Sequence, residues 1–249
     1  MAAPLRLYGL KALVCNAASG IGEASARTLV KHGAAVLAVD TINSGIDQQF
    51  KRVKGIDGLA ANLRDPTRMP ALVEEAVKRL GRLDILVNDF PWQVEAPFAD
   101  NDSDLKDLLQ ARAALIMSLC RSALPHLRKS PAGRIINVGF LRSVFAIDGE
   151  RAFAEAEQDL AALTTALATE TGDFGITANY VQPGAIMTAV SREVFRKNMA
   201  LRDYCIARSA AHRLGEPIDV ARVVAFLAGD DAAFVNGTGI AVDGGRSVT

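Results

Sequence analysis

Short apolar runs alternate with longer amphipathic segments along the chain, a pattern typical of a parallel sheet with helices on both faces. We predict strands at 11–15, 34–40, 58–63, 83–88, 133–138, 176–181 and 239–243. We predict helices at 21–31, 69–80, 105–128, 151–171 and 219–227, with a less regular helical stretch at 189–209. The sequence has no internal repeat and no linker-like segment. The expected fold class is therefore one doubly wound α/β domain over residues 1–249, with a parallel seven-stranded sheet.

Two of the predicted helices have more apolar surface than one sheet face can cover. In 105–128, apolar residues surround the helix on nearly every side, whereas a helix that covers one sheet face needs a stripe of about 100°. The 151–171 helix has large apolar residues on one side and the alanines Ala154, Ala161 and Ala162 on others, where small side chains let a second helix come close. We therefore expect an oligomer that is built on this pair of helices.

Composition narrows the class of protein. Half of the 249 residues are hydrophobic, and 28 Lys and Arg balance 28 Asp and Glu, so nothing indicates a surface for nucleic acid or for an anionic membrane. No apolar run reaches the roughly 18 residues of a membrane-spanning helix, and the N-terminus lacks the apolar core of a signal peptide, so we expect a cytoplasmic protein. Cys15, Cys120 and Cys205 are few and widely spaced, which predicts core thiols and no metal site.

Several motifs occur in register along the whole chain. They are CNAASGIG at 15–22, Asp40 at the end of the second predicted strand, LVND at 86–89, RIINV at 134–138, QPGAIMT at 182–188 and NGTGIAVDGG at 236–245. With these motifs the chain resembles the short-chain dehydrogenase/reductase family, whose members are single-domain Rossmann-type oxidoreductases that use NAD or NADP. Because one fold hosts many activities, the residues at the site must decide the function.

The resemblance implies a cofactor site that has degenerated. The family's first turn has a glycine where this chain has Asn16. Asparagine tolerates unusual backbone angles, so the turn can survive, but its side chain occupies space that the cofactor needs. The family's Asn-Asn-Ala-Gly motif becomes Asn88, Asp89, Phe90 and Pro91 here. A phenyl ring and a proline thus replace the two small residues that leave room for the adenosine.

Other cofactor positions are kept. Gly20 and Gly22 still allow close packing of helix on strand, and Asp40 is placed to accept a hydrogen bond from an adenosine ribose, which would select NAD. An equally open interpretation of Asp40 is a solvated carboxylate at a strand end. We interpret six residues as a vestigial cofactor site, and we predict that this chain binds no cofactor itself. They are Asn16, Gly20, Ile21, Gly22, Asp40 and Asn88.

The catalytic positions that the resemblance implies are all replaced. In the family a Tyr is the general acid/base, a Lys four residues later lowers its pKa, a Ser orients the substrate and an Asn lies on the preceding helix. The corresponding residues here are Phe153, Glu157, Phe140 and Arg112. Phe153 has no proton to exchange, and losing general acid/base help costs about 10²- to 10⁴-fold in rate. We therefore predict no catalytic residues in this chain.

The same replacements suggest a packed core in place of the site. Phe153 and Glu157 are four residues apart and share one helix face, toward which the family geometry also brings Arg112. We expect Arg112 and Glu157 to form an ion pair that fills the old site together with Phe140 and Phe153. The alternative is that both charges reach solvent separately.

The expected function is that of a non-catalytic subunit in a hetero-oligomeric dehydrogenase. The resemblance implies that its partner is an intact paralogue that carries the NAD and oxidises a hydroxyacyl-CoA, and we expect contact through helices 105–128 and 151–171. Two alternatives stay open: a lyase or hydratase that uses Glu155, Glu157 or Asp89 as acid/base, and a regulator that senses NAD. Basic residues after the sixth strand would suit acyl-CoA phosphates, although solvated helix charges explain them more simply. They are Arg192, Arg196, Lys197, Arg202, Arg208 and Arg213.

Overall fold

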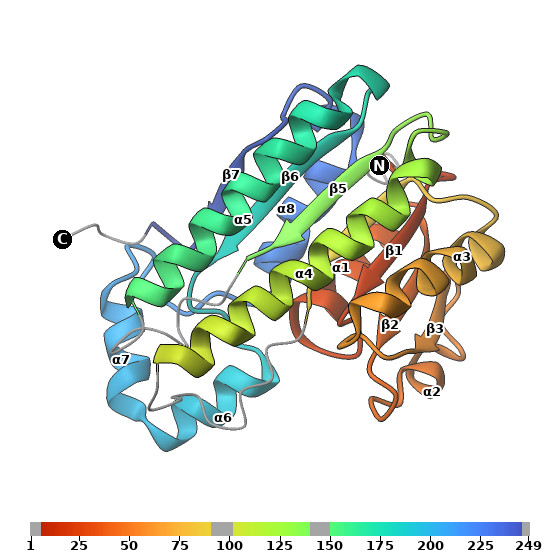
Figure 1. Ribbon diagram of the computed structural model, residues 1–249. Helices are drawn as coiled ribbons and strands as arrows, with labels where there is room; N and C mark the ends of the chain where they lie inside the picture. The colour runs from red at the N-terminus through yellow and green to blue at the C-terminus, as the bar shows by residue number, and fades with distance from the viewer. Residues whose placement is uncertain (1–5, 91–101, 140–149, 246–249) are drawn as a thin grey trace.

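A parallel seven-stranded sheet forms the centre of the molecule (Figure 1). The structure, a computed structural model, describes residues 6–90, 102–139 and 150–245, and the side chains of all of these except 102–109 and 150–157. The strand order is β3-β2-β1-β4-β5-β6-β7, and every neighbouring pair is parallel. The strands are β1 (Lys11–Cys15), β2 (Ala35–Asp40), β3 (Ile56–Ala60), β4 (Ile85–Asn88), β5 (Arg134–Val138), β6 (Thr177–Pro183) and β7 (Gly239–Val242).

Helices cover both faces of the sheet, which confirms the predicted fold class. In Figure 1, α4 and α5 run side by side across one face, and α8 lies behind the sheet, where it packs against α1. The helices are α1 (Gly20–Lys31), α2 (Ile46–Phe50), α3 (Met69–Leu80), α4 (Asp102–Leu127), α5 (Glu150–Thr171), α6 (Ala189–Lys197), α7 (Met199–Ala207) and α8 (Pro217–Ala228). Within the described residues, no helix is both long and apolar enough to cross a bilayer.

The inner strands β2, β1, β4, β5 and β6 are buried on both faces, whereas the edge strands β3 and β7 are largely half-buried, and alternate residues of the inner strands supply the two halves of the core. In β1, Ala12 and Val14 belong to the cluster beneath α1 and α8, whereas Leu13 and Cys15 belong to the cluster beneath α3, α4 and α5. Successive side chains of a strand point to opposite faces, so a strand between two helix layers must be apolar throughout. This requirement explains why the predicted strands read as continuous apolar runs.

Two predicted elements differ from the structure. The third strand is Ile56–Ala60 rather than 58–63, because pairing with β2 begins at Val36 and ends at Asp40, which leaves Leu63 beyond the strand in the core. The stretch at 189–209 is two helices. The Asn198 side chain accepts a hydrogen bond from the Leu201 amide at 2.9 Å, and this cap starts α7 where α6 has ended.

Over residues 110–127, the part of α4 whose side chains the structure describes, most of the large apolar residues are buried within the chain. Leu115, Ile116, Leu119, Leu124 and Leu127 are all buried against the sheet and its neighbouring helices. Its exposed positions, which include Ala111 and Ala114, are small or polar. The second covering surface that the sequence suggested stays a prediction, and an interface on the described part of α4 would use these small residues.

Candidate functional site

The turn between β1 and α1 lies at the carboxyl end of the sheet, where parallel α/β folds place their ligands. Asn16 has a φ of 53°, and Gly20 follows with a φ of 60°. A Cβ added to Gly22 would lie 2.1 Å from the Asn16 carbonyl oxygen, so this glycine is needed for the close approach of helix to strand. Asparagine adopts the left-handed conformation more readily than most residues with a Cβ. The turn therefore keeps its shape with Asn16 in that conformation.

Asp40 ends β2 and is only 6% exposed, so it is not the solvated strand-end carboxylate of our second interpretation. Its Oδ2 accepts the Ala18 amide at 2.8 Å, and its Oδ1 accepts the amide of Thr41 at 2.6 Å and the hydroxyl of Thr41 at 3.2 Å. Both carboxylate oxygens are thus engaged by the chain itself. Asp40 fixes the turn that follows β1 to the end of β2.

Asp89 is a second buried carboxylate beside the same turn, 8% exposed. Its Oδ2 accepts a hydrogen bond from the Asn16 side chain, whose Nδ2 lies 3.5 Å away. Burial raises the pKa of Asp89 to about 7, and the charge of Asp40 adds to this effect, while the Arg112 charge and the Asn16 hydrogen bond oppose it. Asp89 is therefore a group whose charge changes near neutral pH.

Phe90 follows directly and is 2% exposed. It belongs to the core cluster beneath α3, α4 and α5, together with Cys15, Leu63 and Met69. The family's alanine at this position leaves space at the strand ends, whereas here a phenyl ring is packed as core. Pro91 lies outside the described residues.

These residues do not fit a dinucleotide cofactor. The position that should be open for the adenosine holds the buried Phe90 ring. One amide of the turn, that of Ala18, already donates to the carboxylate of Asp40, and the Asn16 side chain donates to Asp89. Both carboxylates carry the same sign of charge as a phosphate, which would have to enter beside them.

Asn88, the sixth residue of the predicted cofactor site, lies in the core rather than at an open edge. Its Nδ2 donates to Asn137 Oδ1 at 2.8 Å and contacts the Cys120 sulfur at 3.3 Å. Asn137 Nδ2 in turn donates to the Thr164 hydroxyl at 3.0 Å. This buried polar chain joins β4, β5 and α5, and no motif in the sequence marks Asn137 or Thr164 as members of it.

Of the four replaced catalytic positions, the structure describes one side chain. Arg112 is buried on α4, and its Nη2 donates to the Val138 carbonyl oxygen at the end of β5, at 2.7 Å. Phe140 lies outside the described residues, and so do the side chains of Phe153 and Glu157 on α5. The expected ion pair between Arg112 and Glu157 therefore stays a prediction.

The basic residues after β6 are mostly neutralised by near neighbours. Glu193 binds Arg196 at 2.9 Å and Lys197 at 3.3 Å, and Arg202 binds Asp203 at 2.7 Å. Exposed pairs of this kind are solvated helix charges. They give no support to a phosphate site for an acyl-CoA.

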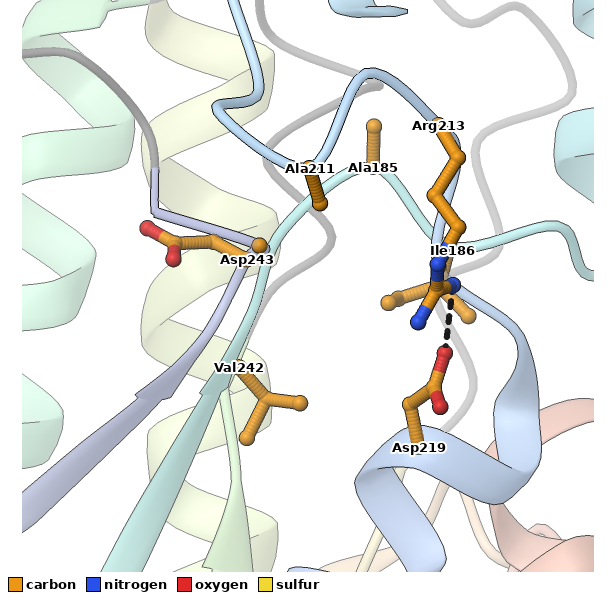
Figure 2. Close-up of a pocket in the computed structure, with 9 residues that line it drawn as sticks. Ala185, Ile186, Ala211, Arg213, Asp219, Val242 and Asp243 are labelled. Carbon is orange, nitrogen blue, oxygen red and sulfur yellow. Dashed lines mark hydrogen bonds and ion pairs between the residues drawn. The ribbon is translucent and has the colours of Figure 1, made fainter.

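A cavity of about 140 Å³ lies at the ends of β6 and β7, apart from the turn after β1. Ile186 and Val242 line its apolar part. Figure 2 shows Arg213 and Asp219 pointing toward each other at its side, 2.8 Å apart, while the Asp243 carboxylate turns away from them. Arg213 and Asp219 thus neutralise each other at the side of the cavity.

Neither a metal site nor a reactive thiol lies in the described part of the chain. No three His, Cys, Asp or Glu side chains in it are grouped to hold a metal ion. The three cysteines are buried, as predicted for core thiols. Burial raises the pKa of Cys15 far above its ordinary value and that of Cys120 to about 12, so both stay protonated at neutral pH.

Comparison with known proteins gives matches over nearly the full length. The family model described as Enoyl-(Acyl carrier protein) reductase matches residues 16–247. The 3-oxoacyl-[acyl-carrier-protein] reductase FabG of Vibrio cholerae is 32% identical over 243 residues, which cover 97% of this chain and 98% of that protein. The protein of the same name from Thermotoga maritima is 28% identical over 246 residues, which cover 97% of this chain and 99% of that protein. Oxidoreductase UcpA of Escherichia coli is 29% identical over 253 residues, which cover 98% of this chain and 96% of that protein.

Proposed function

Because the chain belongs to the short-chain dehydrogenase/reductase family and yet buries Phe90 and Asp89 where the family has Ala and Asn, we propose that it is a non-catalytic subunit of a hetero-oligomeric dehydrogenase. The observation that carries the proposal is the Phe90 ring, packed as core at a position that must be open for the adenosine. The replacement of all four catalytic positions supports it, since Phe153 offers no proton to a substrate.

In this proposal the partner is an intact paralogue that holds the NAD and the Tyr and Lys of the family. Contact is made through α4 and α5, which lie side by side and expose the alanines Ala111, Ala114, Ala162 and Ala166. Helices with small side chains at the contact can approach to the short end of the usual interaxial distance, 8–10 Å. These faces suit a tight helix-to-helix interface.

The substrate of the complex is proposed to be an acyl thioester with a hydroxyl group. Two of the similar proteins are named for activity on a 3-oxoacyl group, which supports an acyl substrate. The pattern of losses resembles the inactive BbsC subunit of 2-[hydroxy(phenyl)methyl]succinyl-CoA dehydrogenase in anaerobic toluene degradation. This chain would then have the same role, in which it stabilises the subunit that oxidises the hydroxyacyl-CoA.

The test is co-expression with an intact family member encoded beside this chain. We expect the two chains to copurify in a fixed ratio, and we expect NAD-dependent oxidation of a hydroxyacyl-CoA by the complex. The isolated chain should neither turn over the substrate nor quench or enhance the fluorescence of NADH. Turnover by the isolated chain would refute the proposal, and binding of NADH without turnover would favour a regulator that senses NAD.

A lyase or hydratase is the second candidate, and the observation in its favour is the pKa of Asp89, raised to about 7. A group with a pKa near the working pH is suited to general acid/base catalysis. Against it, Asp89 is buried and accepts a hydrogen bond from the Asn16 side chain. The side chains of Glu155 and Glu157, the other acids considered, lie outside the described residues. Hydration of an enoyl-CoA by the isolated chain, lost in Asp89→Asn, would establish this candidate.

A further inference from the structure

The cavity at the ends of β6 and β7 lies beneath the chain segment that leads into α8. We propose that it is a binding site for a small uncharged molecule, about the size of one benzene ring, that carries a single hydroxyl or carbonyl group. The site is independent of the role of the chain as a subunit, because none of the residues that line the cavity belongs to the vestigial cofactor site.

The volume of the cavity sets the size of the ligand. Protein interiors leave few voids larger than a water molecule, whereas this cavity measures about 140 Å³. An apolar cavity of about 150 Å³ is large enough to bind benzene. A six-carbon ring with one small substituent is therefore close to the largest molecule that fits, and a dinucleotide or an acyl-CoA is far too large.

One wall of the cavity is an arch, residues 211–215, that is tied at both ends. At one end the Ala211 amide donates to the Gly244 carbonyl oxygen at 2.9 Å. At the other end the Gly215 amide donates to the Ala185 carbonyl oxygen at 2.9 Å. Figure 2 shows the arch passing over the ends of the two strands. Because hydrogen bonds fix both of its ends, the arch holds the cavity open without a ligand.

The floor of the cavity is apolar. Ile186 is 1% exposed and belongs to the core beneath α1 and α8, and Val242 packs against that core. A Cβ added to Gly215 would lie 2.5 Å from Ile186 Cδ1, so the arch already touches the floor at this end. The mouth lies at Ala211 and Gly244, which are exposed. A ring that enters there leaves water and packs on the floor, which favours binding through the hydrophobic effect.

The charges around the cavity disfavour a charged ligand. Arg213 and Asp219 neutralise each other at 2.8 Å, and Asp243 adds a further carboxylate, so negative charge is in excess. An anion would be repelled by this excess. The Asp243 carboxylate turns away from the ion pair in Figure 2 and accepts the Gly245 amide at 2.9 Å, so it gives a cation in the cavity no direct partner.

Arg213 can still bind one polar group of the ligand. Within the described residues its guanidinium makes two hydrogen bonds, to the Asp219 carboxylate at 2.8 Å and to the Leu214 carbonyl oxygen at 2.9 Å, and Nη1 donates both. Nη2 and Nε therefore keep N–H groups that can donate to a ligand oxygen. A hydroxyl or carbonyl oxygen accepts such a bond without bringing a charge into the cavity.

Phenol is the probe for this site at pH 7, and benzoate is its charged analogue of similar size. We expect millimolar phenol to shift the ¹H–¹⁵N signals of Gly215, Val242 and Gly244, while that of Gly22 in the vestigial cofactor site stays in place. Benzoate should bind more weakly by about tenfold or more. The proposal is overturned if phenol causes no shift at the cavity, if its shifts are spread over the whole protein, or if benzoate binds equally well.

A variant at the mouth tests the location of the site. Ala211→Leu places a larger side chain at the entrance and should remove the phenol shifts. The matched control is Ala210→Leu, which makes the same change at an exposed neighbour that does not line the cavity, and it should bind phenol as the wild type does. Phenol binding that survives Ala211→Leu unchanged would refute the site.

The polar contact is tested with Arg213→Met, which keeps a long side chain and removes the donors. We expect this variant to weaken phenol binding by about two- to tenfold and to leave the binding of benzene unchanged. Equal losses for phenol and benzene would refute the hydrogen bond from Arg213.

The end of the chain is the competing occupant, since four residues follow Gly245 in the sequence. Val248→Asp places a charge on this segment, which an apolar cavity would exclude. We expect the variant and the wild type to bind phenol equally. Binding by the variant alone would mean that the chain's own C-terminal residues fill the cavity, and it would overturn the proposal.

Discussion

The carboxylate of Asp40 accepts the Ala18 amide at 2.8 Å, so the end of β2 holds the turn that follows β1. Replacing Asp40 with alanine removes the acceptor of this amide and of the Thr41 amide in a buried region. A buried donor that loses its partner costs about 1–3 kcal/mol. We expect Asp40→Ala to lower the free energy of unfolding in urea by at least that much. Asp47→Ala, at an exposed position, should change it by less than about 0.5 kcal/mol, and an equal effect would contradict this role of Asp40.

Phe90 contributes to the core rather than to a binding surface. Truncation of a buried phenylalanine to alanine typically costs about 3–5 kcal/mol. We expect Phe90→Ala to lower the free energy of unfolding by this amount, and Phe90→Leu to cost less because leucine keeps more of the apolar volume. Urea denaturation followed by circular dichroism measures both. A loss below about 1 kcal/mol for Phe90→Ala would mean that the ring is not packed as core.

Asn16 has a left-handed backbone, which a residue with an ordinary Cβ adopts at a cost of about 1–2 kcal/mol. We expect Asn16→Ala to lose stability by that amount. Asn16→Gly, the matched control, should stay close to the wild type, since glycine adopts this conformation freely and the hydrogen bond to Asp89 is long, at 3.5 Å. If the glycine variant were as unstable as the alanine variant, the side chain rather than the backbone would be the reason for asparagine.

Cys15 and Cys120 should be unreactive in the folded protein. Both are buried, and burial raises the pKa of Cys120 to about 12 and that of Cys15 further, so the reactive thiolate is scarce at pH 8. We expect iodoacetamide at pH 8 to modify neither thiol without denaturant and both in 8 M urea. Peptide mass spectrometry reads out each site, and rapid modification of Cys120 in the native protein would contradict its burial.

The proposed interface can be tested on the outer face of α4. Ala114→Arg places a long charged side chain at an exposed small position, and we expect it to prevent copurification with the partner while the chain itself stays folded. Ala71→Arg makes the same change at an exposed position of α3 and should leave the complex intact. Size-exclusion chromatography of the co-expressed chains distinguishes the two. Retention of the complex by Ala114→Arg would exclude this face of α4 from the interface.

The sheet could be predicted from the sequence because its inner strands are buried on both faces and are apolar runs between turn signals. The bounds of β3 could not be predicted from the sequence, since they depend on which residues of β2 are available for pairing. The turn at Asn16 and Gly22 could be predicted because glycine and asparagine are the residue types that tolerate unusual backbone angles and close backbone contacts. The contact between Asp89 and Asn16 could not be predicted, because the two residues are far apart in the sequence and only the packing of β4 beside β1 brings them together.

The burial of Phe90 also has an evolutionary consequence. A reversal to the family's alanine would remove about 3–5 kcal/mol from a protein that, like most, has about 5–15 kcal/mol of total stability. A reversal at Asn16 costs almost nothing by comparison, because glycine fits its backbone. The family's residues can therefore be introduced with unequal ease: glycine fits the turn in one step, whereas alanine at the end of β4 would first need other mutations that strengthen the core.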